Sequence, residues 1–324
     1  LWRQRSEGLT MAQNPYHVPV MANEVVEMLR SVSPQLIVDA TYGGGGHTRA
    51  LLEAFPGLSV VAIDQDPDAI ARGPVADRVR LVKANFASLD QIAAEICGGT
   101  ADDASLSPCI DGFLFDIGVS SHQLDEPERG FSYRRRGPID MRMDRDAELG
   151  ADTIINHWSV DDIADILWRY GEERLARRVA RAIVAARPIA DTDQLARVVA
   201  EAFPAAARRR KHPARKVFQA IRIAVNDELG SLELGIEAAI RWVRPGGRVL
   251  VISYHSLEDG IVKRRFAAGT VDCECPPDFP VCTCGRVAEL RSPVRKPLRP
   301  SAAEMERNPR ARSAILRVTE KIGA

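Results

Sequence analysis

Short apolar segments alternate with helical patterns along the first third of the chain. Strands are expected at LIVDA, SVVAID, VRLVKANF and DGFLFDIG, and helices at TRALLEAF, DPDAIARG and SLDQIAAEI. Apolar strands separated by helices are typical of a parallel sheet that is covered on both faces. The sequence therefore predicts an α/β fold with a doubly wound, Rossmann-like sheet.

A long helical segment interrupts this alternation. Three-to-four spacing of apolar residues runs from about residue 150 to 203, and strand-like text returns only at 248–253, RVLVIS. One crossover helix needs far fewer residues than this interval contains. We therefore expect a sheet-forming core in two parts, 12–122 and 221–324, with an all-helical insertion at 123–220 near the carboxyl edge of the sheet.

Composition excludes some classes of protein and leaves others open. The chain has 324 residues, of which 45% are hydrophobic, so it can bury a full core. Its 44 basic and 44 acidic residues balance, and any anionic partner must be recognised by local clusters. No apolar run is long enough to span a membrane, and the first residues lack the apolar centre of a secretory signal. A cytoplasmic protein without a membrane partner is expected.

Four glycines follow the first predicted strand, in VDATYGGGGHTRALLEAF at 38–55. Glycines here let the backbone approach a ligand, and the next helix offers free amides to an anionic group. A dinucleotide site needs a third glycine where this chain has Thr48, so the match to that fingerprint is incomplete. A turn without a ligand is the remaining alternative.

Acidic and aromatic residues end the other predicted strands. Asp39 and Asp64 end strands one and two, where a carboxylate can accept both hydroxyls of an adenosine ribose. Phe86 follows the third strand, either flanking an adenine ring or packing in the core. Asp116 ends the fourth strand and precedes Gln123. This set of residues, without a pyrophosphate fingerprint, indicates an S-adenosylmethionine site.

The chain resembles the RsmH (MraW) family of ribosomal RNA small-subunit methyltransferases. The matching text covers nearly the whole chain and includes DATYGGGGHT, AIDQDPDAI, FDIGVSSHQLDEPERGFSYRRRGPIDMRMD, HPARKVFQAIRIAVNDEL and PGGRVLVISYHSLEDGIVKRRF. The resemblance implies a class I methyltransferase that uses S-adenosylmethionine to methylate the exocyclic N4 amino group of a cytosine in 16S rRNA. It implies cofactor contacts from Gly45, Gly46, His47, Asp64, Phe86, Asp116 and Gln123.

The same resemblance implies 16S rRNA or the small ribosomal subunit as the partner, held in part by the helical insertion. Whether the chain forms a homodimer stays open. Two rivals are a nicotinamide-dependent oxidoreductase, which shares the fold and Asp64 but lacks the third glycine, and a non-catalytic ribosome-assembly protein. The glycine and acidic positions weigh against the second rival.

Asp116 is the candidate catalytic residue. The lone pair of a cytosine amino group is delocalised into the ring, so an acceptor for an amino proton favours methyl transfer. The alternative role for Asp116 is a cofactor contact. His47 is expected to contact the cofactor through its backbone rather than act as a base. SYHSLED places four polar residues at the same edge of the sheet, and any of them can face the base: Tyr254, His255, Ser256 and Glu258. The alternative for Ser256 is to cap the next helix, with Asp259 three residues later.

Two basic runs and one cysteine group complete the sequence signals. RRRKHPARK at 208–216 and the three arginines 134–136 are either RNA-binding patches or solvated surface. Six cysteines fit a reducing compartment without disulfides. Four of them, Cys273, Cys275, Cys282 and Cys284, either hold a structural metal or lie on a rigid loop.

Overall fold

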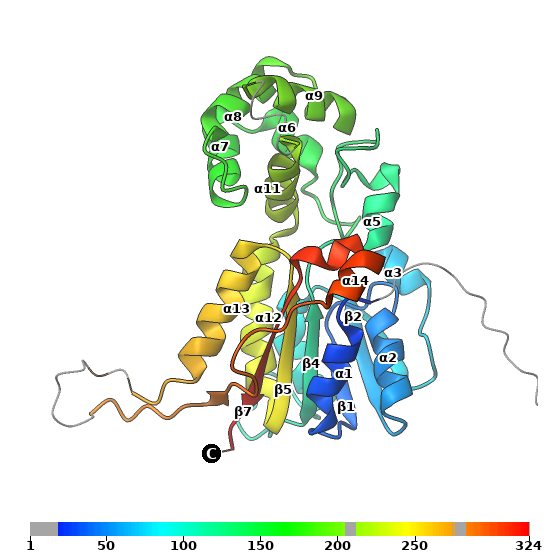
Figure 1. The fold of residues 1–324 in the computed structure, drawn as a ribbon, viewed down its shortest axis with the longest axis vertical. Helices are drawn as coiled ribbons and strands as arrows, with labels where there is room; N and C mark the ends of the chain where they lie inside the picture. Colours follow the sequence, from blue (N-terminus) through cyan, green and yellow to red (C-terminus); the bar gives the residue numbers. More distant parts are fainter. Residues whose placement is uncertain (1–18, 205–211, 274, 276–282, 324) are drawn as a thin grey trace, which may run out of the picture.

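A seven-stranded sheet forms the centre of this computed structural model, which describes residues 19–204, 212–273, 275 and 283–323 (Figure 1). Its strand order is β3-β2-β1-β4-β5-β7-β6. The strands are β1 (Leu36–Asp39), β2 (Ser59–Asp64), β3 (Val79–Lys83), β4 (Ile110–Asp116), β5 (Val243–Ser253), β6 (Leu290–Arg291) and β7 (Ile315–Lys321).

The strand directions confirm the predicted doubly wound α/β fold. Strands β1 to β5 run parallel, whereas β7 is antiparallel to β5 and β6 is antiparallel to β7. The chain builds outward from β1 in both directions, with β2 and β3 on one side and β4 and β5 on the other. Such a reversal of strand order opens a crevice at the carboxyl ends of β1 and β4, where α/β sheets bind ligands.

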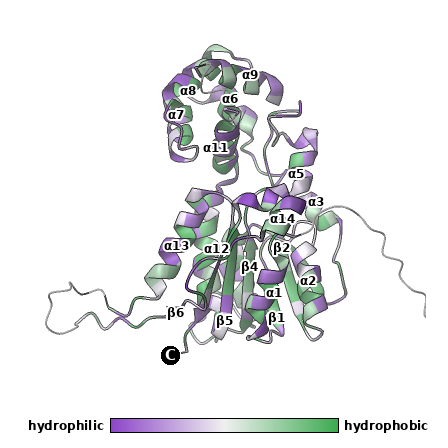
Figure 2. Cartoon of the chain, in the orientation of Figure 1, coloured by the Kyte–Doolittle hydropathy of each residue, from purple (hydrophilic) through white to green (hydrophobic). Residues whose placement is uncertain are grey.

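Helices bury both faces of the sheet, which explains why the central strands β1, β2 and β4 are mostly apolar (Figure 2). In β4, Phe113 and Phe115 pack on one face and Leu114 packs on the other. The first face is covered by α4 (Leu89–Ile96), α12 (Glu228–Trp242) and α13 (Ser256–Gly269), and the second by α1 (Ala22–Arg30) and α2 (Gly46–Ala54). The two faces have separate hydrophobic cores.

A third hydrophobic core belongs to helices that lie between β4 and β5 in the sequence. They are α6 (Ala151–His157), α7 (Val160–Arg169), α8 (Ala176–Ala185), α9 (Thr192–Ala202) and α11 (Ala214–Asn226). Their buried faces share one cluster that includes Ile154, Ile163, Val179, Leu195 and Phe218. Figure 1 shows this group beyond the carboxyl edge of the strands, with α11 reaching back toward α12.

The chain returns from the helical group to the sheet later than the expected boundary at 220. Residue 220 lies inside α11, whose buried side chains continue in the helical cluster as far as Val225. Asp227 follows with a φ of 43° in the left-handed region and separates α11 from α12. The break in the helix, rather than a change in residue composition, marks this junction.

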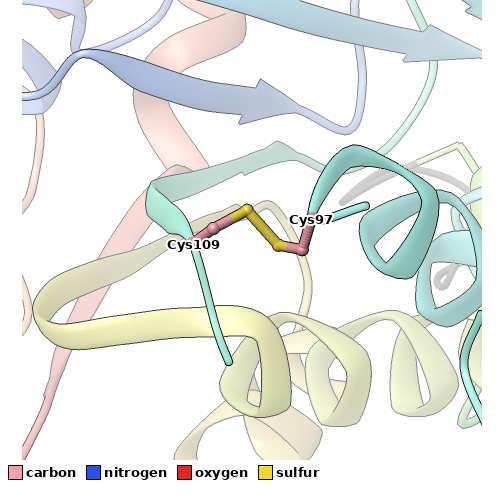
Figure 3. The surroundings of a disulfide bond; sticks show 2 residues. All are labelled: Cys97 and Cys109. Atoms are coloured by element: carbon pink, nitrogen blue, oxygen red, sulfur yellow. A yellow bond between two sulfur atoms is a disulfide. The ribbon is translucent and has the colours of Figure 1, made fainter. Parts of the chain in front are cut away.

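A disulfide joins Cys97 and Cys109, contrary to the expectation of reduced cysteines (Figure 3). Cys97 follows the last residue of α4, and Cys109 directly precedes β4. Their Cα atoms lie 5.7 Å apart, within the range that a disulfide spans. The expectation was wrong because composition reflects the usual redox environment, whereas the path of the connecting loop brings these two thiols together.

Candidate active site

A cavity of about 530 Å³ lies at the carboxyl ends of the strands. Its size is in the range of small-molecule sites. The sheet contributes residues that follow β1, β2, β3, β4 and β5, and the helical group contributes residues of α11. The lining includes Gly43, Gly44, Gly46, His47, Asp64, Phe86, Asp116, Gln123, Arg215, Phe218, Arg222, Tyr254 and His255.

The glycine loop forms one wall of the cavity and depends on glycine at position 45. Gly45 is the N-cap of α2 and has a φ of 71°. A Cβ atom there would lie 2.6 Å from Val75 and 2.8 Å from the Tyr42 hydroxyl, closer than carbon atoms tolerate. The cavity is lined by Gly43, Gly44 and Gly46, whereas Gly45 is not part of its lining. The structure therefore gives Gly45 a conformational role.

Asp64 ends β2 and lines the cavity beside this loop. Its two carboxylate oxygens accept hydrogen bonds from the backbone of Gly43, at 2.7 Å, and of Asp66, at 2.8 Å. Burial raises the pKa of Asp64 to about 6, because the loss of water outweighs these two donors. A carboxylate oxygen accepts more than one hydrogen bond, so this geometry leaves acceptor capacity for ligand hydroxyls.

Asp39 lies behind the cavity instead of sharing the role of Asp64. Its side chain accepts hydrogen bonds from the Thr48 hydroxyl at 2.6 Å and from the Thr41 backbone at 3.2 Å. It is almost completely buried, and burial raises its pKa. The expected ribose contact was wrong for this residue, because its side chain joins β1 to α2.

Asp116 meets two side chains from other elements at the end of β4. Tyr254, which follows β5, donates a 2.7 Å hydrogen bond from its hydroxyl to Asp116 Oδ1. Burial, followed by the neighbouring Asp116 carboxylate, raises the pKa of Tyr254 well above its usual range, so the hydroxyl keeps its proton. The Asp116 backbone donates to Thr41 Oγ1 at 2.7 Å. Tyr254 thus holds the carboxylate of Asp116, while Thr41 holds its backbone.

The imidazole of His47 approaches the same carboxylate from α2. Its Nε2 lies 2.9 Å from the carbonyl oxygen of Val20, and its Nδ1 lies 3.7 Å from Asp116 Oδ2. Since a carbonyl only accepts, we assign the proton to Nε2. The ring is buried and positioned by Val20, which gives the side chain a structural contact that the sequence did not predict.

Gln123 is fixed by a buried polar network that the sequence interpretation missed. Its side-chain oxygen accepts from the Ser120 backbone at 2.9 Å, and its amide donates to Asp66 Oδ2 at 2.7 Å. Arg129 donates to the same Asp66 carboxylate at 2.8 Å and to Asp68 at 2.7 Å. The network joins the loop after β2 to α5 (Ser121–Asp125), so Gln123 shapes the cavity while it binds neighbours.

Phe86 lies between the cavity and the core of the sheet. It begins a short 3-10 helix, Phe86–Ser88, and lines the cavity. Its ring also packs edge-to-face against Phe115, with centroids 5.8 Å apart and planes at 80°. The side chain is therefore an apolar wall of the cavity held by the sheet core.

The cap of α13 lies one residue earlier than expected. His255, not Ser256, is the N-cap, and it forms a capping box with Glu258. Ser256 instead donates to Glu172 Oε2 at 2.8 Å, a contact between α13 and the loop after α7. The pairing of Ser256 with Asp259 was wrong because β5 ends at Ser253, which leaves His255 in extended conformation before the helix.

Aromatic and basic residues border the cavity on the side of the helical group. The Tyr133 ring stacks on His212 with centroids 5.0 Å apart and meets Phe218 edge-to-face at 5.9 Å. Arg215 is exposed and lines the cavity, as does Arg310. Residues 208–211 of the first basic run lie outside the described residues.

The second basic run is largely engaged within the protein. Arg134 lies over the Tyr133 ring at 5.6 Å, and Arg136 forms a 2.9 Å ion pair with Asp191. Arg135 donates to the backbone oxygen of Asp125.

In the part of the chain that the structure describes, no helix is both long and apolar enough to cross a membrane.

Comparisons with known proteins find relatives that match nearly the whole chain. The model of the MraW methylase family matches residues 14–322. The ribosomal RNA small subunit methyltransferase H of Symbiobacterium thermophilum is 49% identical over 95% of this chain and 98% of its own length. The protein of the same name from Heliobacterium mobile is 47% identical over 95% and 99%. A solved rRNA methylase from Streptococcus thermophilus aligns with 95% of this chain and 99% of its own at 12% identity and a TM-score of 0.40.

Proposed function

The chain belongs to the MraW methylase family, and we propose that it methylates the N4 amino group of a cytosine in 16S rRNA with S-adenosylmethionine. Support comes from relatives named for small-subunit rRNA methylation that are similar over nearly their full length. The observation that carries the proposal is the Asp116–Tyr254 pair, which lies in the same cavity as Asp64 and the glycine loop.

The residues of the cavity fit S-adenosylmethionine. Asp64 is a buried carboxylate at the second strand end, suited to the ribose hydroxyls. The glycine loop leaves the backbone of Gly43, Gly44 and Gly46 open to the cavity, next to the start of α2. Phe86 provides an apolar wall for an adenine ring. When bound, the cofactor supplies an electrophilic methyl group.

Asp116 would accept a hydrogen bond from the amino group of the target base. This contact favours the pyramidal nitrogen that attacks. As the carbon–nitrogen bond forms and the bond between methyl and sulfur breaks, the amino proton would pass to the Asp116 carboxylate and from there to solvent. Tyr254 holds Oδ1 of Asp116, so the carboxylate has a defined orientation before the base arrives. The alternative, in which Asp116 only contacts the cofactor, is separated from this role by the variants described in the Discussion.

The helical group would hold the RNA, and we retain the division into a core, a helical insertion and a second core segment as part of the proposal. Arg215 and Arg310 border the cavity and can contact phosphates. Tyr133 and Phe218 line the cavity and give it an aromatic side beside which an unpaired base can lie. These residues supply what the sequence after Asp116 lacks, an aromatic for the target base.

Methyl transfer to defined substrates tests the proposal. Purified protein with methyl-labelled S-adenosylmethionine should label small subunits or 16S rRNA prepared from a strain that lacks this gene. Nuclease digestion and mass spectrometry should then locate the label in N4-methylcytidine. Complete absence of transfer to either substrate would contradict the proposed activity, and transfer to a base other than cytosine would contradict its specificity.

A further inference from the structure

Three cysteine thiols come together in the loop between α13 and β6. The sulfur atoms of Cys273, Cys275 and Cys284 all lie within 4.8 Å of one another. The sulfurs of Cys273 and Cys284 are 3.9 Å apart, although these residues are distant in the sequence. The sequence interpretation included Cys282 in this group, and that residue lies outside the described residues.

The spacing of these sulfurs matches a metal better than a disulfide. Zinc binds thiolates at about 2.3 Å, and tetrahedral geometry then places two sulfurs about 3.8 Å apart. A disulfide would require about 2.05 Å between the sulfurs. The 3.9 Å between the sulfurs of Cys273 and Cys284 is therefore near the tetrahedral value.

Backbone amides surround the sulfurs in a way that suits thiolates. The amide of Cys275 donates to Cys273 Sγ at 3.4 Å, and the amide of Thr283 donates to Cys275 Sγ at 3.4 Å. Amides that donate to a metal ligand fix its orientation and reduce the charge that it carries. Gly285 follows with a φ of 62°, which turns the chain away directly after Cys284.

We propose that Cys273, Cys275 and Cys284 bind one zinc ion as thiolates. Each cysteine releases its proton to solvent on binding, and the three sulfurs leave one tetrahedral position for a fourth ligand. The role is structural, because none of the three residues lines the cavity described above. The ion would close the connection from α13 to β6, after the C-terminal end of α13.

Metal analysis of the full-length protein tests this site directly. Protein purified without a metal-binding tag should contain one zinc per chain by elemental mass spectrometry. The variant Cys273→Ser/Cys284→Ser should lose it, whereas the matched control Cys97→Ser/Cys109→Ser should keep it. Zinc in the control but not in the test variant supports the site, and equal zinc in both overturns it.

Two further measurements keep the proposal testable if the double variant fails to fold. Cys284→His retains a ligand atom and should keep zinc, while Cys284→Ser should lose most of it. Cobalt(II) added to metal-free wild-type protein should give the absorption of thiolate-to-cobalt charge transfer with at least three sulfur ligands. Absence of that absorption, or a disulfide between any two of the three cysteines in fresh protein, would contradict the site.

Discussion

The hydroxyl of Tyr254 lies 2.7 Å from Oδ1 of Asp116, and this hydrogen bond joins the ends of two neighbouring parallel strands. Asp116 pairs with Ile252 in the sheet, and Tyr254 lies two residues after Ile252, directly after the end of β5. The position of the carboxylate is consequently set by the register of β4 and β5. The tyrosine needs no intervening loop, because it directly follows Ser253, the last residue of β5.

Replacement of Tyr254 by Phe should lower kcat by about tenfold to a hundredfold, the effect of losing a hydrogen bond to a charged group of about 1.5–3 kcal/mol. Asp116→Asn should lower it further, by about 10² to 10⁴ if the carboxylate assists proton removal. Cofactor affinity, measured by calorimetry, should change little in either variant. A large loss of affinity with an unchanged kcat would assign Asp116 to cofactor binding alone.

Asp64→Ala should weaken S-adenosylmethionine binding by about 1.5–3 kcal/mol, the contribution of a charged hydrogen bond. Calorimetry measures this change, and a melting curve checks that the amides of Gly43 and Asp66 tolerate the loss of their acceptor. The exposed Asp77, which is outside the cavity lining, provides the control Asp77→Ala. If Asp64→Ala and Asp77→Ala bind S-adenosylmethionine with equal affinity, Asp64 does not contribute to cofactor binding.

The pKa of about 6 for Asp64 predicts a pH dependence of cofactor affinity. Above pH 6 the carboxylate is ionised and accepts ligand hydroxyls. Below pH 6 a proton occupies the carboxylate, which then accepts fewer hydrogen bonds. The affinity for S-adenosylmethionine should therefore fall by up to about tenfold per pH unit. Calorimetry from pH 5 to 7.5 should show this slope in wild type, and Asp64→Asn should lack it.

The same group also affects stability, with the opposite dependence. Because burial raises the pKa from 3.8 to about 6, the folded protein without cofactor binds more protons than the unfolded chain between these values. The contribution of Asp64 to the free energy of unfolding therefore decreases as pH rises through this window and is constant above it. Cofactor binding should reduce that decrease, since it favours the ionised form.

Arg215→Ala should weaken RNA binding and reduce its dependence on salt by about one phosphate contact, without changing cofactor affinity. Arg181 on α8, which is exposed and outside the cavity lining, provides the control variant. Replacing Arg208, Arg209 and Arg210 together should have a larger effect of the same kind. If RNA binding by Arg215→Ala and by the triple variant depends on salt as much as binding by wild type does, these arginines belong to solvated surface.

Cys109→Ser should remain active and form no covalent adduct with RNA that contains 5-fluorocytidine. Methylation at carbon five of cytosine would require a thiolate that attacks the ring. Cys109 lies at the amino end of β4, whereas Asp116 ends that strand, and its sulfur is bonded to Cys97. Detection of 5-methylcytidine or of an adduct dependent on Cys109 would contradict direct transfer to nitrogen.

Features that follow from strand order were predictable from the sequence. Parallel strands end at one edge, so the positions of Asp64 and Asp116 at the ends of their strands were enough to place both on one cavity. The direction in which a side chain points was harder to predict from the sequence. Asp39 also ends a strand, yet it points to Thr48, because which way a strand-end side chain turns depends on the packing of α2.

Contacts between distant segments were the least predictable. The cap of α13 was misplaced because serine is a better N-cap than histidine by residue type, while the end of β5 decides which residue is extended. The pairing of Arg129 with Asp66 and the disulfide of Cys97 with Cys109 both depend on the path of loops. Neither leaves a periodic pattern in the sequence.

The position of the helical group between β4 and β5 affects the order in which the protein can fold. These strands are neighbours in the sheet, and pairing them requires closure of the whole intervening segment. The entropy lost on closing a flexible loop increases with its length. Helices with their own buried core, held by contacts that are near in sequence, can form first and bring the two ends of that segment together. We therefore expect nucleation within the helices to precede completion of the sheet, so that the side of the sheet that contains β5, β7 and β6 is the last part of the core to assemble.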